Sequence, residues 1–309
     1  MRIVFHDLTV EPEPWLAALR AAFPGAVVEP WQAGAPPADY ALVWAPPQQL
    51  LDEQTRLKAL FNVAAGVDAL LKLKLPAGVP VFRLEDAGMA VQMAEYVCQA
   101  VIRVFRELEA VEADTRSGRW QQRKPRARGE FSVGVIGLGV LGQRVLAALA
   151  AFDFPLRGWS RTVHSIAGVD TFAGPAQFDA FLAGCQVLVN LLPLTPETEN
   201  ILNRQSLMRL PVGAYLVNVA RGRHLVEEDL LAALDCGHLS GALLDVFRQE
   251  PLPAEHPFWR HPRITLTPHT SARTLRRESL DQIIAKIGAL EAGTPPDSLG
   301  GRVRVEVGY

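Results

Sequence analysis

The sequence predicts an α/β protein built from two doubly wound parallel-sheet domains. Short apolar runs alternate with helical patterns along the whole chain, which is typical of parallel sheets covered by helices. The length of 309 residues corresponds to about two domains. A glycine-rich turn at residues 137–142 follows one of the apolar runs and opens a helix, and this indicates a strand–turn–helix unit in the second half of the chain.

The first half of the chain contains four predicted strands and one early helix. The helix is expected at residues 14–23, and the strands at residues 3–5, 40–44, 60–65 and 79–83. Pro46 and Pro47 end the second of these strands, and Gly66 closes the third. The alternation favours a first domain with a parallel sheet.

One long amphipathic helix is predicted between the two halves. Apolar residues recur at spacings of three and four from Met89 to Val111, so we expect one continuous helix that acts as a strut between domains. A polar connector follows at residues 117–130. Its basic residues are Arg119, Arg123, Lys124, Arg126 and Arg128. Because this cluster is short and isolated, we interpret it as a solvated interdomain arm and not as a site for a polyanion.

A second alternating series fills the rest of the chain. Strands are expected at residues 133–137, 156–159, 187–191, 215–219, 242–246 and 264–266. Helices are expected at residues 141–152, 227–235 and 274–291. The predicted domains are therefore a discontinuous one, residues 1–95 plus 274–309, and a continuous one, residues 96–273.

Composition excludes several classes of protein. The chain has 31 basic and 33 acidic residues, a net charge of -2, so nucleic acid is not expected as a partner. No long apolar segment or leader-like N-terminus is present, which predicts neither membrane insertion nor export. Cys98, Cys185 and Cys236 are widely spaced and form no C-x-x-C pair, so we expect no metal site and a reduced, cytoplasmic protein.

The glycine turn predicts a bound dinucleotide. Gly137 permits the tight turn, Gly139 lets the pyrophosphate approach the backbone, and Gly142 lets the helix pack on the strand. The start of the helix, with Val140 and Leu141, supplies N–H groups and positive potential for the phosphates. A glycine-rich turn without a ligand is the alternative interpretation.

The strand after the glycine turn predicts which dinucleotide is bound. An NAD-binding unit of this kind carries an acidic residue about 20 residues on, to hold the ribose hydroxyls. Here Ser160, Arg161 and Thr162 occupy that place, and no carboxylate is present. Because Arg161 can pair with a 2′-phosphate and the two hydroxyls can donate to it, we predict a preference for NADPH over NAD. An exposed arginine without a cofactor role remains the alternative.

Three polar residues follow predicted strands of the second half and suggest the chemistry. Arg221, Glu250 and His269 each come shortly after such a strand, and ligands of open α/β sheets bind at the carboxyl ends of the strands. An arginine offers a bidentate fork to a carboxylate, and a histidine can donate a proton to a developing alkoxide. A neighbouring glutamate favours the charged imidazole. In isolation each residue has an ordinary alternative, as a surface charge, a helix cap or a turn residue.

Longer segments resemble a known family. They are residues 61–68, 82–89, 95–96, 137–142, 159–162 and 190–198, the surroundings of Arg221, Asp245, Glu250 and His269, and the closing Gly308 and Tyr309. In these segments the chain resembles the D-isomer-specific 2-hydroxyacid dehydrogenase family, and more narrowly its glyoxylate/hydroxypyruvate reductase A branch. The resemblance implies a flavodoxin-like substrate domain, a Rossmann cofactor domain, and an active-site cleft between them.

The resemblance also implies an activity. It is the NADPH-dependent reduction of small 2-oxo acids, glyoxylate to glycolate and hydroxypyruvate to D-glycerate, by a homodimer. Arg221 would hold the substrate carboxylate, His269 would donate the proton and Glu250 would pair with His269. Asp245 would lie near the nicotinamide amide, and Leu192, Pro193 and Ala220 would also contact the cofactor.

The first domain is implied to contribute to the substrate site. Ala65 and Gly66 would present backbone N–H groups to the carboxylate, and Trp44 would limit substrate size. Family members often have glycine where Ala64 stands, and this departure makes the backbone contacts of the loop less secure. Trp120, on the basic arm, would reach the active site of the partner subunit.

Two other functions are compatible with the same features. One is a binding protein that senses the dinucleotide, as corepressors of this fold superfamily do. The other is a dehydrogenase for a different D-2-hydroxy acid, of the D-lactate or phosphoglycerate type. A phosphoglycerate site would need more basic residues in the first domain than the single candidate Arg83.

Overall fold

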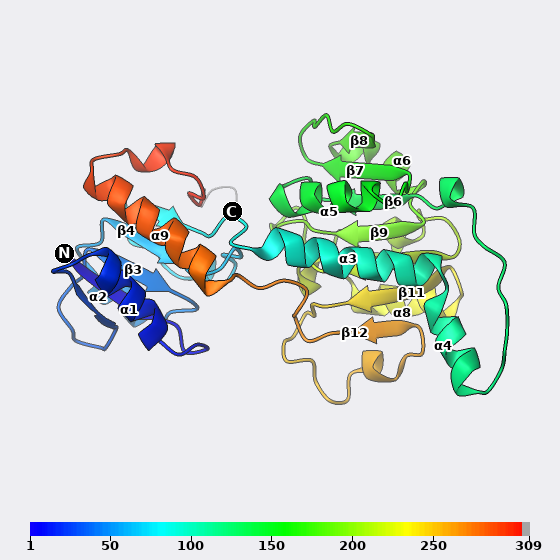
Figure 1. The fold of residues 1–309 in the computed structure, drawn as a ribbon, viewed down its shortest axis with the longest axis horizontal. Helices are drawn as coiled ribbons and strands as arrows, with labels where there is room; N and C mark the ends of the chain where they lie inside the picture. Colours follow the sequence, from blue (N-terminus) through cyan, green and yellow to red (C-terminus); the bar gives the residue numbers. More distant parts are fainter. Residues whose placement is uncertain (305–309) are drawn as a thin grey trace. The chain divides into compact units, whose positions relative to one another are not determined.

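The computed structural model describes residues 1–304, and its chain forms two compact units. The first comprises residues 1–89 and the chain from residue 274 onward, and the second comprises residues 90–273. The first and the last segments of the described chain therefore belong to one unit (Figure 1). The second unit begins at Ala90, whereas the sequence placed the change of domain after residue 95. Gly308 and Tyr309 lie outside the described residues.

The first unit contains a five-stranded parallel sheet in the order β2-β1-β3-β4-β5, the order of flavodoxin-like folds. Its strands are β1 (Arg2–His6), β2 (Val27–Pro30), β3 (Tyr40–Val43), β4 (Ala59–Asn62) and β5 (Val81–Phe82). The sequence pattern did not predict β2, a four-residue edge strand that buries only Val28. A short edge strand covers too few positions to develop the period of two that identifies buried strands.

Helices cover both faces of this sheet. They are α1 (Glu13–Ala22), α2 (Gln48–Glu53) and α9 (Arg276–Glu291). Ile3 and Phe5 pack with apolar residues of α1 and α9, whereas Val4 packs on the opposite face with Leu50 and Leu51 of α2. The alternation along β1 thus explains why the strand is apolar throughout, since both of its faces are covered.

The second unit contains a seven-stranded parallel sheet in the order β12-β11-β10-β9-β6-β7-β8. Its strands are β6 (Val133–Ile136), β7 (Leu156–Ser160), β8 (Val169–Ala173), β9 (Val187–Asn190), β10 (Ala214–Asn218), β11 (Leu239–Leu244) and β12 (Ile264–Leu266). The chain runs outward from β6 to β8 and then returns to β9 on the other side of β6. The strand order therefore reverses between β6 and β9, which is where ligands bind in doubly wound sheets. The edge strand β8 was missed because none of its residues is buried.

Helices α3 (Met89–Phe105), α4 (Leu108–Arg116) and α5 (Val140–Ala150) precede or follow β6 in the chain, and α3 crosses one face of the sheet (Figure 1). The shorter helices are α6 (Phe178–Leu182), α7 (Arg204–Leu207) and α8 (Glu227–Asp235). Side chains of these three helices form one buried cluster with inward-facing residues of the central strands, such as Leu188, Leu216 and Leu244. Both sheets thus have the doubly wound form that the sequence predicted.

The prediction of one continuous helix over residues 89–111 is wrong. The helix ends at Phe105, and α4 begins at Leu108 after Glu107, whose backbone is left-handed with φ of 53°. Tertiary contacts hold this bend: the Phe105 ring packs edge-on against Phe131 and Phe154. Glu107 accepts a hydrogen bond from Arg126 at 3.0 Å. The apolar period continues past the bend, so the period alone could not locate it.

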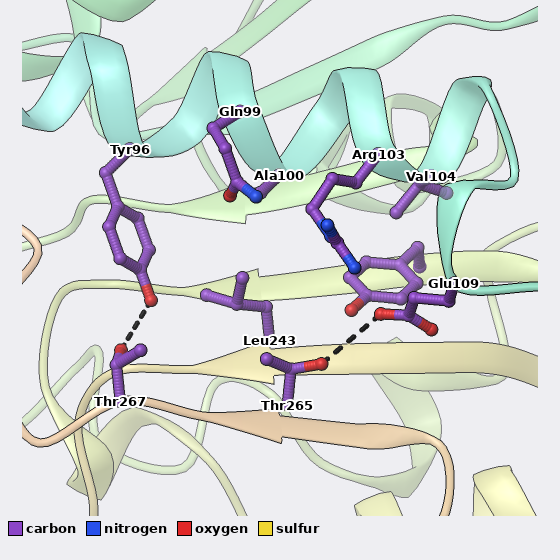
Figure 2. A pocket seen from close by; sticks show the side chains of 10 residues that line it. Tyr96, Gln99, Ala100, Arg103, Val104, Glu109, Leu243, Thr265 and Thr267 are labelled. Atoms are coloured by element: carbon purple, nitrogen blue, oxygen red, sulfur yellow. Dashed lines mark hydrogen bonds between the residues drawn. The ribbon is translucent and has the colours of Figure 1, made fainter. Parts of the chain in front are cut away.

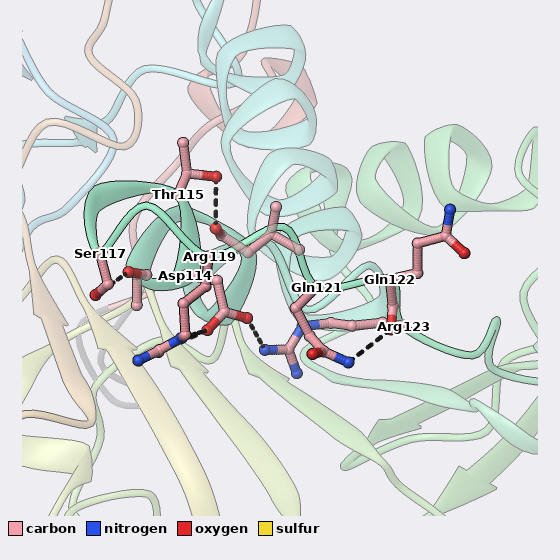
Figure 3. Close-up of polar contacts among 9 residues, drawn as sticks. Asp114, Thr115, Ser117, Arg119, Gln121, Gln122 and Arg123 are labelled. Carbon is pink, nitrogen blue, oxygen red and sulfur yellow. Dashed lines mark hydrogen bonds and ion pairs between the residues drawn. The ribbon is translucent and has the colours of Figure 1, made fainter.

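The basic connector is tied to α4 by ion pairs (Figure 3). Asp114 is buried and accepts hydrogen bonds from Arg119 at 2.7 Å and from Arg123 at 2.6 Å. These two hydrogen bonds hold the pKa of the Asp114 carboxyl below its usual range. Arg128 stacks over the rings of Phe105 and Phe154. Several of the clustered charges are therefore paired with acidic side chains or stacked on aromatic rings.

Neither a membrane span nor a metal cluster is found in the described part of the chain. Among residues 1–304 no helix has the length and apolar character needed to cross a bilayer. The same residues contain no group of three or more His, Cys, Asp or Glu side chains placed to hold a metal ion. The three cysteines are unpaired; Cys98 and Cys185 are buried and Cys236 is exposed.

Candidate active site

The glycine turn joins β6 to α5 at the switch point of the second sheet. Gly137 has φ of 100°, in the left-handed region that favours glycine, and its N–H donates to the Trp159 carbonyl of β7 at 2.8 Å. A Cβ at Gly142 would lie 1.9 Å from the Gly137 carbonyl oxygen, so only glycine lets α5 approach the turn this closely. A Cβ at Gly139, by contrast, would meet nothing within 4 Å.

The turn fits the pyrophosphate of a dinucleotide. Gly139 is the N-cap residue of α5, and no side chain caps this end of the helix. The first N–H groups of the helix, beginning with half-exposed Val140, therefore point out of an uncapped end. Positive potential from the helix dipole is concentrated there. An open approach at Gly139 and an uncapped helix end are what an anionic group needs.

A buried polar network supports the two loops that follow β9 and β10. Asn190, Asn218 and His224 are all fully buried. The Asn190 amide nitrogen donates to Asn218 Oδ1 at 2.9 Å and lies 3.0 Å from His224 Nδ1. Asn190 Oδ1 accepts from the Leu192 N–H, and Asn218 Oδ1 accepts from the Ala220 N–H. His224 Nε2 lies 3.2 Å from the Pro193 carbonyl.

This network holds the loops that carry Leu192, Pro193 and Ala220. None of the three network residues was predicted from the sequence. An asparagine that ends each of two apolar strands was the feature that could have identified Asn190 and Asn218. Nothing in the sequence indicated that His224 is buried between them.

The turn after β7 holds the residues expected to bind a 2′-phosphate. Ser160 is buried and its hydroxyl donates to the Thr162 carbonyl at 2.6 Å, which shapes the turn. Arg161 and Thr162 are exposed. The Arg161 charge helps to hold the pKa of Glu197 below its usual range, after the larger effects of hydrogen bonds from Thr195 and the Glu197 backbone. The guanidinium is thus at the surface, in reach of an anionic ligand.

His269 and Glu250 form a hydrogen-bonded pair in the second unit. His269 Nδ1 lies 2.7 Å from Glu250 Oε2, and the Phe247 N–H donates to Glu250 Oε1 at 2.9 Å. Burial raises the pKa of Glu250, but the hydrogen bonds from His269 and Phe247 and the positive charges of His269 and Arg221 outweigh it, and the pKa is lowered. An ionised Glu250 accepts hydrogen bonds only, so His269 Nδ1 carries a proton and Nε2 faces away from the carboxylate.

Close packing of two loops brings Arg221 near the His269–Glu250 pair. A Cβ at Gly222 would lie 1.8 Å from the Phe247 carbonyl carbon, so the loop after β10 is pressed against the loop after β11. Arg221 Nη1 donates to the Ala220 carbonyl at 2.7 Å, and its charge lowers the pKa of Glu250. The structure therefore gathers Arg221, Glu250 and His269 at the carboxyl edge of one sheet.

Asp245, directly after β11, supports the turn that carries His269. Its side chain is fully buried and accepts three hydrogen bonds from the turn after β12: from Thr267 Oγ1 at 2.5 Å, Thr270 N at 2.8 Å and Ser271 N at 2.9 Å. The Asp245 carboxylate thus stabilises the turn that carries His269.

Trp44, Ala64, Ala65 and Gly66 all lie in the first unit. The Asn62 side chain donates to the carbonyls of Ala64 and Gly66, each at 2.8 Å, and so sets the loop after β4. Trp44 packs partly buried against the core between the sheet and helices α1 and α9. Its ring therefore contributes to the core of this unit.

Comparison with known proteins identifies the family. Residues 98–271 match the family model described as D-isomer specific 2-hydroxyacid dehydrogenase, NAD binding domain. The glyoxylate/hydroxypyruvate reductase A of Serratia proteamaculans is 50% identical over 100% of both chains, and that of Yersinia enterocolitica is 47% identical over 98% of this chain and 99% of its own.

Solved structures with the same fold carry a dinucleotide. A D-isomer specific 2-hydroxyacid dehydrogenase from Xanthobacter autotrophicus, in complex with NADPH and MES, matches with a TM-score of 0.94 and 40% identity over 100% of this chain and 99% of its own. An NADPH-dependent glyoxylate/hydroxypyruvate reductase from Sinorhizobium meliloti, in complex with NADP and sulfate, matches with a TM-score of 0.92 and 35% identity over the same shares. Full-length identity at this level, together with the glycine turn and the two doubly wound sheets, places the chain in the family of D-isomer specific 2-hydroxyacid dehydrogenases.

Proposed function

We propose that this protein is an NADPH-dependent reductase of small 2-oxo acids, with glyoxylate and hydroxypyruvate as the first substrates to test. The observation that carries the proposal is the His269–Glu250 pair beside Arg221 at the sheet edge that also holds the glycine turn. The relatives of highest identity cited above are named for this activity. In this proposal residues 90–273 bind the cofactor.

The chain's own residues have defined roles in the proposed reaction. A reduced nicotinamide cofactor held by the glycine turn would supply the hydride that the carbonyl carbon of the substrate accepts. Arg221 binds the substrate carboxylate and polarises the carbonyl, because its guanidinium can form two parallel hydrogen bonds. His269 donates the proton from Nε2 to the carbonyl oxygen, which becomes the hydroxyl of the product. Glu250 fixes the ring by accepting from Nδ1 and stays ionised.

Two further aspects belong to this proposal. A homodimer would place the exposed arm, with Trp120 94% exposed, where a partner could cover it. A cytoplasmic location suits three cysteines that form no disulfide. Gel filtration with light scattering tests the first aspect, and a monomer at micromolar concentration would contradict it.

The activity is tested by following the loss of NADPH absorbance with a panel of 2-oxo acids. We expect turnover with glyoxylate or hydroxypyruvate, and a fall in kcat of roughly 10²- to 10⁴-fold for His269→Ala. His256→Ala, a histidine outside the site, is the control and should keep the wild-type rate. Tight NADPH binding with no turnover of any 2-oxo acid would indicate a dinucleotide-sensing protein instead.

The cofactor preference is tested by Arg161→Ala. Loss of the guanidinium removes a charge-assisted contact to the 2′-phosphate, which is worth roughly 1.5–3 kcal/mol, or about 10- to 100-fold in affinity. We expect the Kd for NADPH to rise by this factor while the Kd for NADH stays constant, as measured by fluorescence titration. An equal change for both cofactors would show that Arg161 does not read the phosphate.

A further inference from the structure

A chain of side-chain hydrogen bonds runs from helix α3 to the turn that carries His269. Tyr96, on α3, has its hydroxyl 2.5 Å from Thr267 Oγ1, and Thr267 Oγ1 donates to Asp245 Oδ1 at 2.5 Å (Figure 2 shows the first contact). Thr267 has one hydroxyl proton, and it goes to Asp245. The Tyr96 hydroxyl must therefore donate to Thr267.

Tyr96 is suited to donate at neutral pH. Burial raises the pKa of Tyr96 to about 12, the charge of Asp245 adds to the rise, and the hydrogen bond with Thr267 opposes it. The phenol thus keeps its proton over the whole physiological range. All donors in this series of hydrogen bonds therefore point the same way: Tyr96 donates to Thr267, and Thr267 donates to the buried Asp245 carboxylate.

The far end of the chain shapes the backbone around His269. Asp245 accepts from the N–H groups of Thr270 and Ser271, and the Asp245 carbonyl accepts from the His269 N–H at 2.9 Å. His269 itself has φ of 54°, in the left-handed region, where a residue other than glycine persists only if its surroundings hold it. The hydrogen bonds to Asp245 are such a restraint, on both sides of the histidine.

We propose that Tyr96 is a positioning residue for His269, acting through Thr267 and the buried Asp245. This inference rests on the proposed function of His269. Tyr96 touches neither His269 nor Glu250 in any hydrogen bond of the described residues, so its effect is transmitted through the turn.

The same pocket provides a matched control. Tyr215 also lines it, and its hydroxyl shares a side-chain hydrogen bond with Thr265, the middle residue of β12. Tyr96→Phe and Tyr215→Phe each remove one phenolic hydroxyl from the same pocket. Only the first variant interrupts the chain to Asp245.

The first readout needs neither cofactor nor substrate. In the ligand-free protein, amide hydrogen exchange measured by NMR should speed up at Thr270 and Ser271 by roughly five- to tenfold in Tyr96→Phe, the effect of one hydrogen bond. Tyr215→Phe should leave these two amides at the wild-type rate. Equal exchange in Tyr96→Phe and the wild type would overturn the proposal, whether or not the protein is a reductase.

The second readout is turnover in a double-mutant cycle. Tyr96→Phe should lower kcat roughly tenfold without changing the Kd for NADPH, because a small displacement of His269 affects the reacting geometry and not the distant pyrophosphate site. Thr267→Val should lower kcat at least as far, and Thr267→Ser, which keeps the hydroxyl, should restore it. The double variant Tyr96→Phe/Thr267→Val should be no slower than Thr267→Val alone, since both act through one chain.

Additive losses in the double variant would overturn the proposal, as would a kcat for Tyr96→Phe equal to that of Tyr215→Phe. Melting temperatures of all variants check that they fold, and Thr267→Ser keeps the test available if Thr267→Val does not. A wild-type protein without turnover would contradict the proposed function alone, because the exchange measurement still decides the role of Tyr96.

Discussion

At the scale of the residue, the ionisation of Glu250 connects the geometry to the chemistry. Its carboxylate accepts from His269 and from the Phe247 N–H and lies in the field of Arg221. These interactions overcome the burial that would favour the neutral acid, so its pKa is lowered. The sequence placed Arg221, Glu250 and His269 after three strands but left each with an ordinary alternative, and the 2.7 Å contact brings the last two together.

The substitution Glu250→Gln removes the negative charge of this side chain while keeping its shape, so it tests the effect of the charge alone. A carboxyl with a pKa lowered by folding stabilises the native state above its unfolded pKa, and this contribution is lost as the pH falls through the folded pKa. The free energy of unfolding of Glu250→Gln should therefore depend less on pH than that of the wild type below about pH 4.5. Urea unfolding at pH 3 to 7 measures this difference.

Activity gives the matching result at neutral pH. Glu250→Gln should lower kcat by about 10-fold or more, because a neutral amide orients the imidazole less strongly than a carboxylate. Glu255→Gln, on the following loop, is a control that changes the same charge. For the unfolding experiment, the same pH dependence of the unfolding free energy in the wild type and in Glu250→Gln would contradict the lowered pKa of Glu250.

At the scale of the element, the turn between β6 and α5 assigns different tasks to its glycines. Gly142 provides close packing, since a Cβ there would lie 1.9 Å from the Gly137 carbonyl oxygen. Gly139 leaves open space, since a Cβ there meets nothing within 4 Å. The G-x-G-x-x-G pattern predicted the close packing at Gly142, and its prediction that the pyrophosphate approaches at Gly139 is compatible with the open space there. It could not predict the break at Glu107, because that depends on aromatic contacts of Phe105 with residues distant in the sequence.

Alanine at each of these two glycines should produce opposite effects. Gly142→Ala should lower stability by roughly 1–3 kcal/mol, because the methyl group has no space and the backbone must move. Gly139→Ala should leave stability unchanged and weaken NADPH binding at least about tenfold, because the methyl group occupies the approach of the pyrophosphate. Thermal unfolding and fluorescence titration measure the two quantities. A loss of stability in Gly139→Ala would contradict the open space found there.

At the scale of the whole molecule, the chain forms two units with separate cores and two sheet orders. The glycine turn, the buried network of Asn190, Asn218 and His224, and the His269 turn all belong to residues 90–273. A dinucleotide bound to that unit stabilises it by mass action.

Addition of NADPH should therefore raise the melting temperature. At a concentration 100 times the Kd, binding contributes about 2.7 kcal/mol, which corresponds to roughly 5–10 °C for a unit of this size. Differential scanning calorimetry with NADPH and with NADH at equal concentration measures the effect, and we expect the larger shift with NADPH. Hydrogen exchange protection confined to residues 1–89 would contradict the assignment of the cofactor to the second unit.

The sequence by itself determined the α/β class, the two sheets, the dinucleotide turn and the three polar residues of the site. These features depend on local periods, on glycine geometry and on the position of a residue after its strand, all of which can be read along the chain. Only the tertiary structure decided the edge strands β2 and β8, the bend after α3, the burial of His224, and the commitment of Asp245 to the His269 turn. Each of these depends on contacts between segments far apart in the sequence, such as Tyr96 with Thr267, and no local pattern encodes such a pairing.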